Sequence, residues 1–230
     1  MKNNFEIKIE EIIKQLTLEE KVGMIHGAGL FRTEGVERLG IKPLKMADGP
    51  MGVRNEFPDN SWVPFGFSDD YVSYLPCNYA LASTWNRDLA YKEGSVLGNE
   101  ARGRGKDIIL APGINIVRSP LCGRNFEYMS EDPYLTKEMA VPYVKGVQEN
   151  DVAVCVKHFA VNNQETERLN YNAIVSDRAL REIYFPAFES IVKEANAYSI
   201  MTSYNKIWDK YCAHNPKLLH RLRLQSSHKP

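Results

Sequence analysis

Short runs of apolar residues recur along the chain, and several of them end in polar residues. The runs are too short to be helices, and continuous apolar runs of this length are typical of parallel strands that are buried on both faces. A fifth candidate at 75–82 is weaker, because Pro76 and Asn78 interrupt it and proline is rarely found in a central strand. The four clear runs predict strands at residues 44–48, 108–112, 152–158 and 198–205.

Amphipathic segments that carry helix start signals lie between these runs. Thr17 and Glu20 form a capping box ahead of an early helix, and Thr84 can cap the helix that follows it. Asp132 followed by Pro133 predicts another helix start, since proline at the first helical position has no amide hydrogen to lose. A chain needs such crossover helices to pass from one parallel strand to the next.

The last of these segments begins at Ser176 or Asp177 and is predicted to be the longest helix. Its apolar residues recur at helical spacing, and its charged residues lie mostly off the stripe that they form. We interpret the segment as a surface helix that turns one face to the core. The apolar stripe consists of Leu180, Ile183, Ala187, Phe188, Ile191 and Ala195.

The alternation of strands and helices, with one strand in roughly every 40 residues, indicates an α/β fold. An open doubly wound sheet that binds a dinucleotide should carry G-x-G-x-x-G directly after a strand, and the sequence has no such motif. A complete barrel takes eight units and about 250 residues. The four or five strands therefore predict an incomplete TIM-type (β/α) barrel with parallel strands and crossover helices, which lacks units on its C-terminal side.

Composition and charge narrow the possible partners. Hydrophobic residues make up 43% of the 230 residues and aromatic residues 10%, which is enough apolar material for a sizeable core. The 29 lysines and arginines balance the 29 aspartates and glutamates. Because no net field would attract nucleic acid or an anionic membrane surface, neither is an expected partner.

The chain also lacks the usual marks of export and of metal binding. The first residues alternate between charged and apolar, unlike a signal peptide, and no run approaches the ~20 apolar residues of a membrane helix. The four cysteines are far apart without CxxC spacing, as expected of buried thiols in a reducing compartment, so a cytoplasmic location is expected. The five histidines show no metal-ligand spacing, and no metal site is expected.

Polar residues at the ends of the predicted strands are the candidates for function, because the active site of a barrel forms at the C-terminal ends of its strands. Taken singly, each could be an ordinary turn or solvated loop residue. Together they combine one carboxylate with several cations, which suits a polyhydroxylated ligand whose hydroxyls donate to Asp48 and accept from the cations. A phosphate would suit the cations but not Asp48. The candidates are Asp48, Arg54, Arg124, Lys157, His158, Arg168 and Tyr204, with Asn205 next to the last.

Several longer motifs follow one another in unbroken order between residues 17 and 211. They read Thr17-Leu18-Glu19-Glu20-Lys21, Ala47-Asp48-Gly49-Pro50, Gly123-Arg124-Asn125-Phe126-Glu127 continuing to Ser130-Glu131-Asp132-Pro133, Lys157-His158-Phe159, Asn163-Gln164-Glu165-Thr166 and Ser203-Tyr204-Asn205. This set resembles the family 3 glycoside hydrolases, and in particular their β-glucosidases. Where the β-N-acetylhexosaminidases of the family carry Pro-Gly-His-Gly, this chain reads Ala160-Val161-Asn162-Asn163, which favours glucosidase-like specificity.

The resemblance implies hydrolysis of terminal non-reducing β-D-glucosyl residues with retention of configuration. In that mechanism one carboxylate attacks the anomeric carbon and another protonates the departing oxygen. A β-glucoside or oligosaccharide substrate is implied, with no metal or organic cofactor. The family's subsite for the terminal sugar carries over onto Asp48, Arg124, Lys157, His158 and Arg168, and Tyr204 matches the tyrosine near the nucleophile.

The resemblance also implies that parts of the enzyme lie elsewhere. The attacking aspartate is expected beyond Pro230, and the acid/base residue is usually supplied by a second domain. The last residues depart from the acidic helix that the family would place there, which a frameshift or truncation would explain. We expect residues 1–219 to be a partial N-terminal barrel domain and 220–230 to be an aberrant, disordered tail, and the chain alone to be inactive.

Two other hypotheses about the function are open at this point. The chain could be a non-catalytic module or remnant that binds sugar without chemistry. It could also be a Schiff-base enzyme of the aldolase type, with Lys157 at a strand end as the amine nucleophile.

Overall fold

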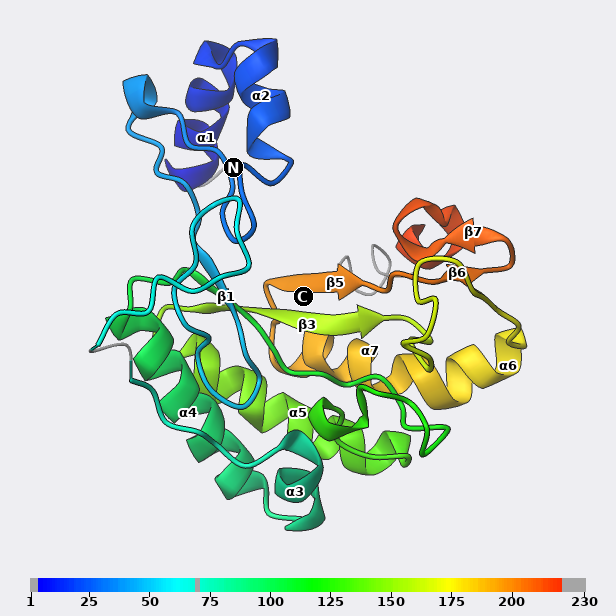
Figure 1. Cartoon of the computed structure of the whole chain (residues 1–230). Coiled ribbons are helices and arrows are strands. Elements are labelled where there is room, and N and C mark those ends of the chain that lie inside the picture. The colour runs from blue at the N-terminus through cyan, green and yellow to red at the C-terminus, as the bar shows by residue number, and fades with distance from the viewer. Residues whose placement is uncertain (1–3, 69–70, 221–230) are drawn as a thin grey trace. The chain divides into compact units, whose positions relative to one another are not determined.

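The computed structural model of the chain describes residues 4–68 and 71–220 (Figure 1). The chain divides into two compact units. The first comprises the residues up to 46 together with 55–71, and the second comprises 47–54 together with the residues from 72 onward. Residues 221–230, which make up nearly all of the expected tail, lie outside the described residues.

The first unit begins with two helices, α1 (Asn4–Gln15) and α2 (Leu18–Met24), and also contains a short 3-10 helix (Glu37–Leu39). The predicted capping box is confirmed, because the Glu20 amide donates to the Thr17 hydroxyl and the Thr17 amide donates to the Glu20 carboxylate. Capping satisfies amides at the start of α2 that have no partner within the helix.

The second unit is built on a four-stranded sheet. Its order is β1 (Met46–Asp48), β2 (Ile108–Leu110), β3 (Ala153–Phe159) and β5 (Ser199–Thr202). The pairs β2–β3 and β3–β5 are parallel. All four clear strand predictions are confirmed, and across residues 4–68 and 71–220 the sheet is not closed into a barrel. A small second sheet joins β4 (Asn172–Ala173), β6 (Lys206–Ile207) and β7 (Lys210–Tyr211).

The weaker strand prediction at 75–82 is wrong, because residues 78–83 form the helix α3 (Asn78–Ser83). The three buried residues of α3 are Asn78, Leu81 and Ala82, which are three and four positions apart. That spacing puts them on one face of a helix, whereas on a strand they would point to both faces. A short apolar run does not by itself distinguish these two outcomes.

Helix α4 (Arg87–Gly103) follows, but it begins two residues later than predicted. The side chain of Asn86 accepts from the amides of Asp88 and Leu89 at 3.0 and 3.2 Å and is the cap. Thr84 instead donates its hydroxyl to the Leu81 carbonyl at 2.7 Å, so it ends α3. Asn and Thr are both good caps, and the loop between α3 and α4 decides which of them is used.

The remaining crossover helices match their start signals. Helix α5 (Pro133–Gln148) is capped by Asp132, whose carboxylate accepts from the Tyr134 amide at 2.8 Å. Ser176 caps a continuous helical segment made of α6 (Asp177–Ala179), a π turn (Leu180–Tyr184) and α7 (Phe185–Glu194). The predicted stripe of this segment faces the core, with Ile183 half-buried and the other members buried.

The helices beside the sheet pack closely against one another. Helices α4, α5 and α7 run along one side of the sheet (Figure 1). A Cβ atom added to Gly94 of α4 would lie 2.2 Å from the Tyr143 carbonyl oxygen, and one added to Gly146 of α5 would lie 2.2 Å from the Tyr91 carbonyl oxygen. These two glycines therefore allow α4 and α5 to touch backbone to backbone.

Candidate functional site

Asp48 at the end of β1 meets Lys157 in β3. The Lys157 ammonium donates to Asp48 Oδ1 at 2.8 Å, and Arg54 Nη1 lies 3.6 Å from Asp48 Oδ2. The amide of Gly49 also donates to Asp48 Oδ1, at 3.0 Å. Lys157 is 2% exposed, whereas the side chain of Asp48 is 32% exposed, so the carboxylate is the part of this pair that a ligand can reach.

The charge state of Asp48 follows from these contacts. Burial by itself would raise the pKa of this carboxyl, but the neighbouring Lys157 ammonium, the Gly49 amide and Arg54 together hold the pKa below its usual value. Asp48 is therefore an ionised acceptor at neutral pH.

His158, the next residue of β3, is buried at 1% exposure. Its Nε2 lies 3.3 Å from Nη2 of Arg124, and its Nδ1 lies 2.9 Å from the hydroxyl of Tyr128. Because a guanidinium only donates, Nε2 must accept and the ring proton belongs on Nδ1. Burial, together with the charges of Arg124, Lys157 and Arg168, lowers the pKa of His158 to about 2, so the imidazole is neutral.

Two further carboxylates, which the sequence interpretation missed, hold the cations of the site. Glu127 is 2% exposed and pairs with Arg124 and with Lys157, whose Nζ lies 3.3 Å from Glu127 Oε2. Glu165 lies 3.0 Å from Arg168 and 3.7 Å from Arg124. The description of the site as cations around one acidic group is thus wrong. Both glutamates stand in the recognised motifs, but the motifs give no sign that these side chains turn toward the strand ends.

Arg168 and Tyr204 are two exposed members of the cluster. The guanidinium carbon of Arg168 lies 4.3 Å from the centre of the Tyr204 ring, which is a cation–π contact. The Tyr204 ring is in turn 6.3 Å from the His158 ring, centre to centre. Asn205 does not join them, because it is fully buried and its side-chain amide donates to the backbone carbonyls of Ala160 and Lys206.

The structure thus brings all seven predicted residues into one connected cluster within the second unit. Four cations face three carboxylates and a neutral imidazole, so the cluster carries one net positive charge. Exposed carboxylate and guanidinium groups can accept from and donate to an uncharged polyhydroxylated molecule. Each of the three carboxylates is engaged in an ion pair with at least one of the four cations.

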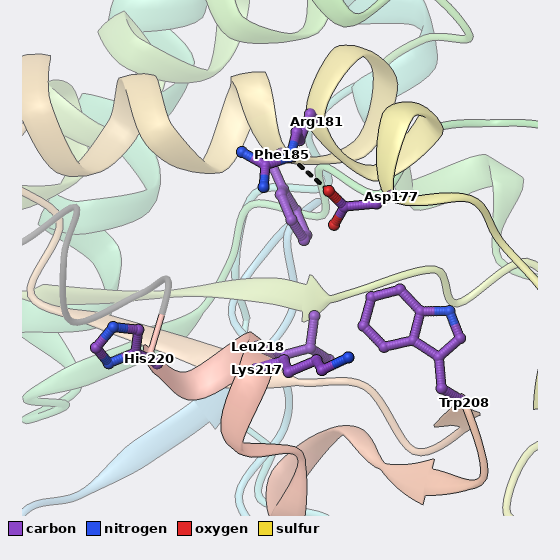
Figure 2. A pocket seen from close by; sticks show the side chains of 7 residues that line it. All are labelled: Asp177, Arg181, Phe185, Trp208, Lys217, Leu218 and His220. Atoms are coloured by element: carbon purple, nitrogen blue, oxygen red, sulfur yellow. Dashed lines mark hydrogen bonds and ion pairs between the residues drawn. The ribbon is translucent and has the colours of Figure 1, made fainter.

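A separate cavity of about 560 Å³ lies between the segment around Asp177 and the chain near Leu218 (Figure 2). Its charged groups already have partners. Arg181 pairs with Asp177 at 2.7 Å, and the Lys217 ammonium lies 5.3 Å from the centre of the Trp208 ring. We therefore place the candidate site at the strand ends and not in this cavity.

Within residues 4–68 and 71–220, no group of three or more histidine, cysteine, aspartate or glutamate side chains is arranged to hold a metal ion. No helix among the same residues is both long and apolar enough to cross a membrane.

Comparison with known proteins gives consistent matches. The family model described as the N-terminal domain of glycosyl hydrolase family 3 matches residues 67–227. A β-glucosidase of Bacteroides ovatus is 49% identical over 214 residues, which is 93% of this chain and 28% of that protein. An exo-α-(1→6)-L-arabinopyranosidase of Bifidobacterium longum is 44% identical over 207 residues, covering 90% of this chain and 27% of that protein.

Among solved structures, β-glucosidase 3B from Thermotoga neapolitana in complex with glucose superimposes with a TM-score of 0.87 and 44% identity. That match covers 95% of this chain and 32% of the other. The chain therefore spans between a quarter and a third of the length of these relatives.

Proposed function

The chain belongs to glycosyl hydrolase family 3, and from this membership we propose that it forms most of the pocket for the terminal non-reducing β-D-glucosyl residue of a retaining β-glucosidase. The observation that carries the proposal is the contact of Asp48 with Lys157, flanked by Arg124 and His158. A glucosyl unit offers several neighbouring hydroxyls, each of which can donate to a carboxylate and accept from a cation.

The charge states support a neutral sugar as the ligand. Asp48 is an ionised acceptor that is one-third exposed, and a carboxylate acceptor gives stronger hydrogen bonds than a neutral one. Asp48, Glu127 and Glu165 together offset three of the four cationic charges, so the cluster lacks the large excess of positive charge that an anionic ligand would favour. The neutral His158 adds no charge of its own.

Catalysis in this proposal needs groups from outside the described site. A retaining mechanism uses one carboxylate as nucleophile and a second as general acid. Asp48 is held by Lys157 and Arg54, and Glu127 and Glu165 are held by arginines and a lysine. We propose that these three carboxylates bind and position, and that the chain alone binds glucose but does not turn over a glucoside.

The test is calorimetric titration of the 230-residue chain with glucose, together with the Asp48→Asn variant. Removing the charge of Asp48 is expected to weaken glucose binding by about tenfold or more, because a hydrogen bond to a charged group is worth about 1.5–3 kcal/mol. Glu182→Gln is the matched control, since Glu182 is an exposed carboxylate paired with Arg178 on a helix surface. Equal glucose affinities of the wild type and Asp48→Asn would contradict the proposal.

A turnover assay and a second sugar sharpen the test. Sustained hydrolysis of an aryl β-glucoside by the isolated chain would contradict the assignment of catalysis to groups outside it. L-arabinose is titrated beside glucose, because its pyranose ring lacks the exocyclic hydroxymethyl group and one relative is an arabinopyranosidase. Tighter binding of arabinose than of glucose would indicate that the substrate is an arabinopyranoside and not a β-glucoside.

The two other hypotheses about the function make different predictions. A sugar-binding module without chemistry would bind glucose as part of a protein that never hydrolyses glucosides, so activity of the whole protein separates it from a glucosidase. A Schiff-base enzyme needs a lysine amine that is free to attack a carbonyl. The Lys157 ammonium is held by two carboxylates at 2.8 and 3.3 Å, which disfavours that role.

A further inference from the structure

Glu93 is a buried carboxylic acid outside the candidate site. It lies in the middle of α4 and is 7% exposed. Within residues 4–68 and 71–220, no hydrogen bond or ion pair reaches its carboxyl group, and Oε1 is enclosed without a partner. Native proteins rarely leave a buried carboxyl group in this state, because desolvation without a compensating partner is costly.

An apolar cavity of about 400 Å³ has Glu93 among the residues that line it. Such a volume falls within the range of small-molecule sites, which are mostly apolar with a few polar groups that fix the ligand. Leu81 is buried on its inner side, whereas Leu89 and Val96 are 42% and 41% exposed at its mouth. The lining comes from α4 and from the segment that leads into and through α3, and its apolar members include Leu75, Pro76, Leu81, Leu89 and Val96.

None of the described groups around Glu93 forms an ion pair with its carboxyl group, so a cation that does so would have to come from a ligand. From α5, Tyr143 faces it, but burial raises the pKa of that phenol well above 10 and its hydroxyl donates to the Pro50 carbonyl at 2.9 Å. From α4 itself, Lys92 lies at the exposed rim of the cavity. The other lining residues, from α4 and from the segment through α3, carry no charge. Burial raises the pKa of Glu93 to about 7, so it ionises near neutral pH.

We propose that the Glu93 cavity is a binding site for primary alkylammonium ions, with the ammonium group against the Glu93 carboxylate and the alkyl chain along the apolar walls. The charge argument selects a cation, because an anionic ligand would meet an unpaired carboxylate. The walls select an alkyl body, because they offer apolar contact and removing alkyl surface from water is favourable. Folding has already desolvated the carboxylate, so much of the usual penalty for a buried ion pair does not fall on the binding step.

Binding at this site should be linked to proton release. A cation close to a carboxylate favours its ionised form. Below pH 7 the cavity of the free protein holds a protonated acid, and an incoming ammonium ion displaces that proton. Primary amines stay protonated across this range. The affinity for hexylammonium is therefore expected to rise about tenfold from pH 6 to pH 8, as the ionised fraction of Glu93 rises from about a tenth to about nine-tenths.

The experiment is calorimetric titration of the 230-residue chain with hexylammonium chloride at pH 6 and pH 8. At pH 6 it is carried out in two buffers of different ionisation enthalpy, so that proton release appears as a difference in the measured heat. Butylammonium is the second probe, and each methylene group removed is expected to weaken binding about threefold to fourfold. The Glu93→Gln variant should lose both the pH dependence and the preference for hexylammonium over 1-hexanol.

Two further variants keep the test independent of folding defects. Val96→Trp changes a half-exposed residue at the mouth and should block both probes while leaving the core intact. Glu100→Gln removes a charge from the same helix at a position paired with the Ser73 hydroxyl at 2.6 Å, and it should change nothing. Equal binding of hexylammonium at pH 6 and pH 8, equal binding by Glu93→Gln, or no saturable binding by the wild type at pH 8 would each overturn the proposal.

Discussion

Glu127 and Glu93 are buried to a similar extent, at 2% and 7% exposure, and both belong to the second unit. Glu127 sits beside the strand ends and pairs with Lys157 and Arg124, whereas no partner among the described residues reaches Glu93 between the helices. The comparison shows that burial does not decide the role of an acid in this fold. The strand ends supply partners that tie Glu127 into ion pairs, whereas Glu93 has none among the described residues and is able to gain or lose a proton near neutral pH.

The largest expected effect is at the paired acid. Glu127→Ala leaves Lys157 buried with only the half-buried Asp48 beside it, and Arg124 loses its nearest carboxylate. Breaking a buried ion pair by removing one partner typically costs about 3–5 kcal/mol. Urea unfolding of the variant should show a loss of this size in the free energy of unfolding, and a loss below about 1 kcal/mol would mean that the pairs contribute little.

The next effect is the pH dependence of stability at the unpaired acid. The pKa of Glu93 is raised in the folded state to about 7 from an ordinary 4.5, so the folded state binds its proton more tightly than the unfolded state. Its contribution is fully present below pH 4.5 and is lost as the pH rises to about 7. The difference should be on the order of 3 kcal/mol.

The measurement is the free energy of unfolding of the wild type and of Glu93→Gln at pH 5 and pH 8. The Gln variant should lack the part of the pH dependence that belongs to this group. Parallel pH profiles of the two proteins would show that Glu93 has the same pKa in the folded and unfolded states.

A smaller effect tests how the paired acid is positioned. Asn78 is fully buried, and its side-chain amide donates to the Glu127 backbone carbonyl at 2.8 Å. Asn78→Ala removes this bond and leaves a carbonyl unsatisfied, at a cost of about 1–3 kcal/mol. Thermal unfolding gives the size of the loss. An accompanying drop in glucose affinity would indicate that Asn78 also helps to position the cluster, and an unchanged affinity would limit its role to stability.

The smallest expected effect comes from an exposed acid. Glu182 is 59% exposed and pairs with Arg178 four residues earlier on the helix surface. Glu182→Gln should change the free energy of unfolding by no more than about 0.5 kcal/mol, because exposed ion pairs are screened by water and salt. A larger loss would mean that an ion pair in this fold contributes strongly to stability without being buried.

Local patterns in the sequence predicted most of the fold. The four clear strands, the capping box of Thr17 and Glu20, and the start at Asp132 and Pro133 are signals that neighbouring residues carry by themselves. The two predictions that were wrong also rested on short stretches of neighbouring residues. The run at 75–82 was too short to show its period, and the choice between Thr84 and Asn86 depended on a loop that the sequence leaves open.

The sequence by itself determined the four main strands, the crossover helices with clear start signals, the motifs that resemble family 3, and the seven polar residues to examine at the strand ends. Only the tertiary structure decided that Glu127 and Glu165 hold the cations, that His158 is neutral, and that Glu93 is buried without a partner. The physical reason is the separation along the chain over which each kind of interaction acts. Caps and hydrophobic periods act between residues a few positions apart, whereas the pKa of a buried group depends on burial and on charges brought to it from distant parts of the chain.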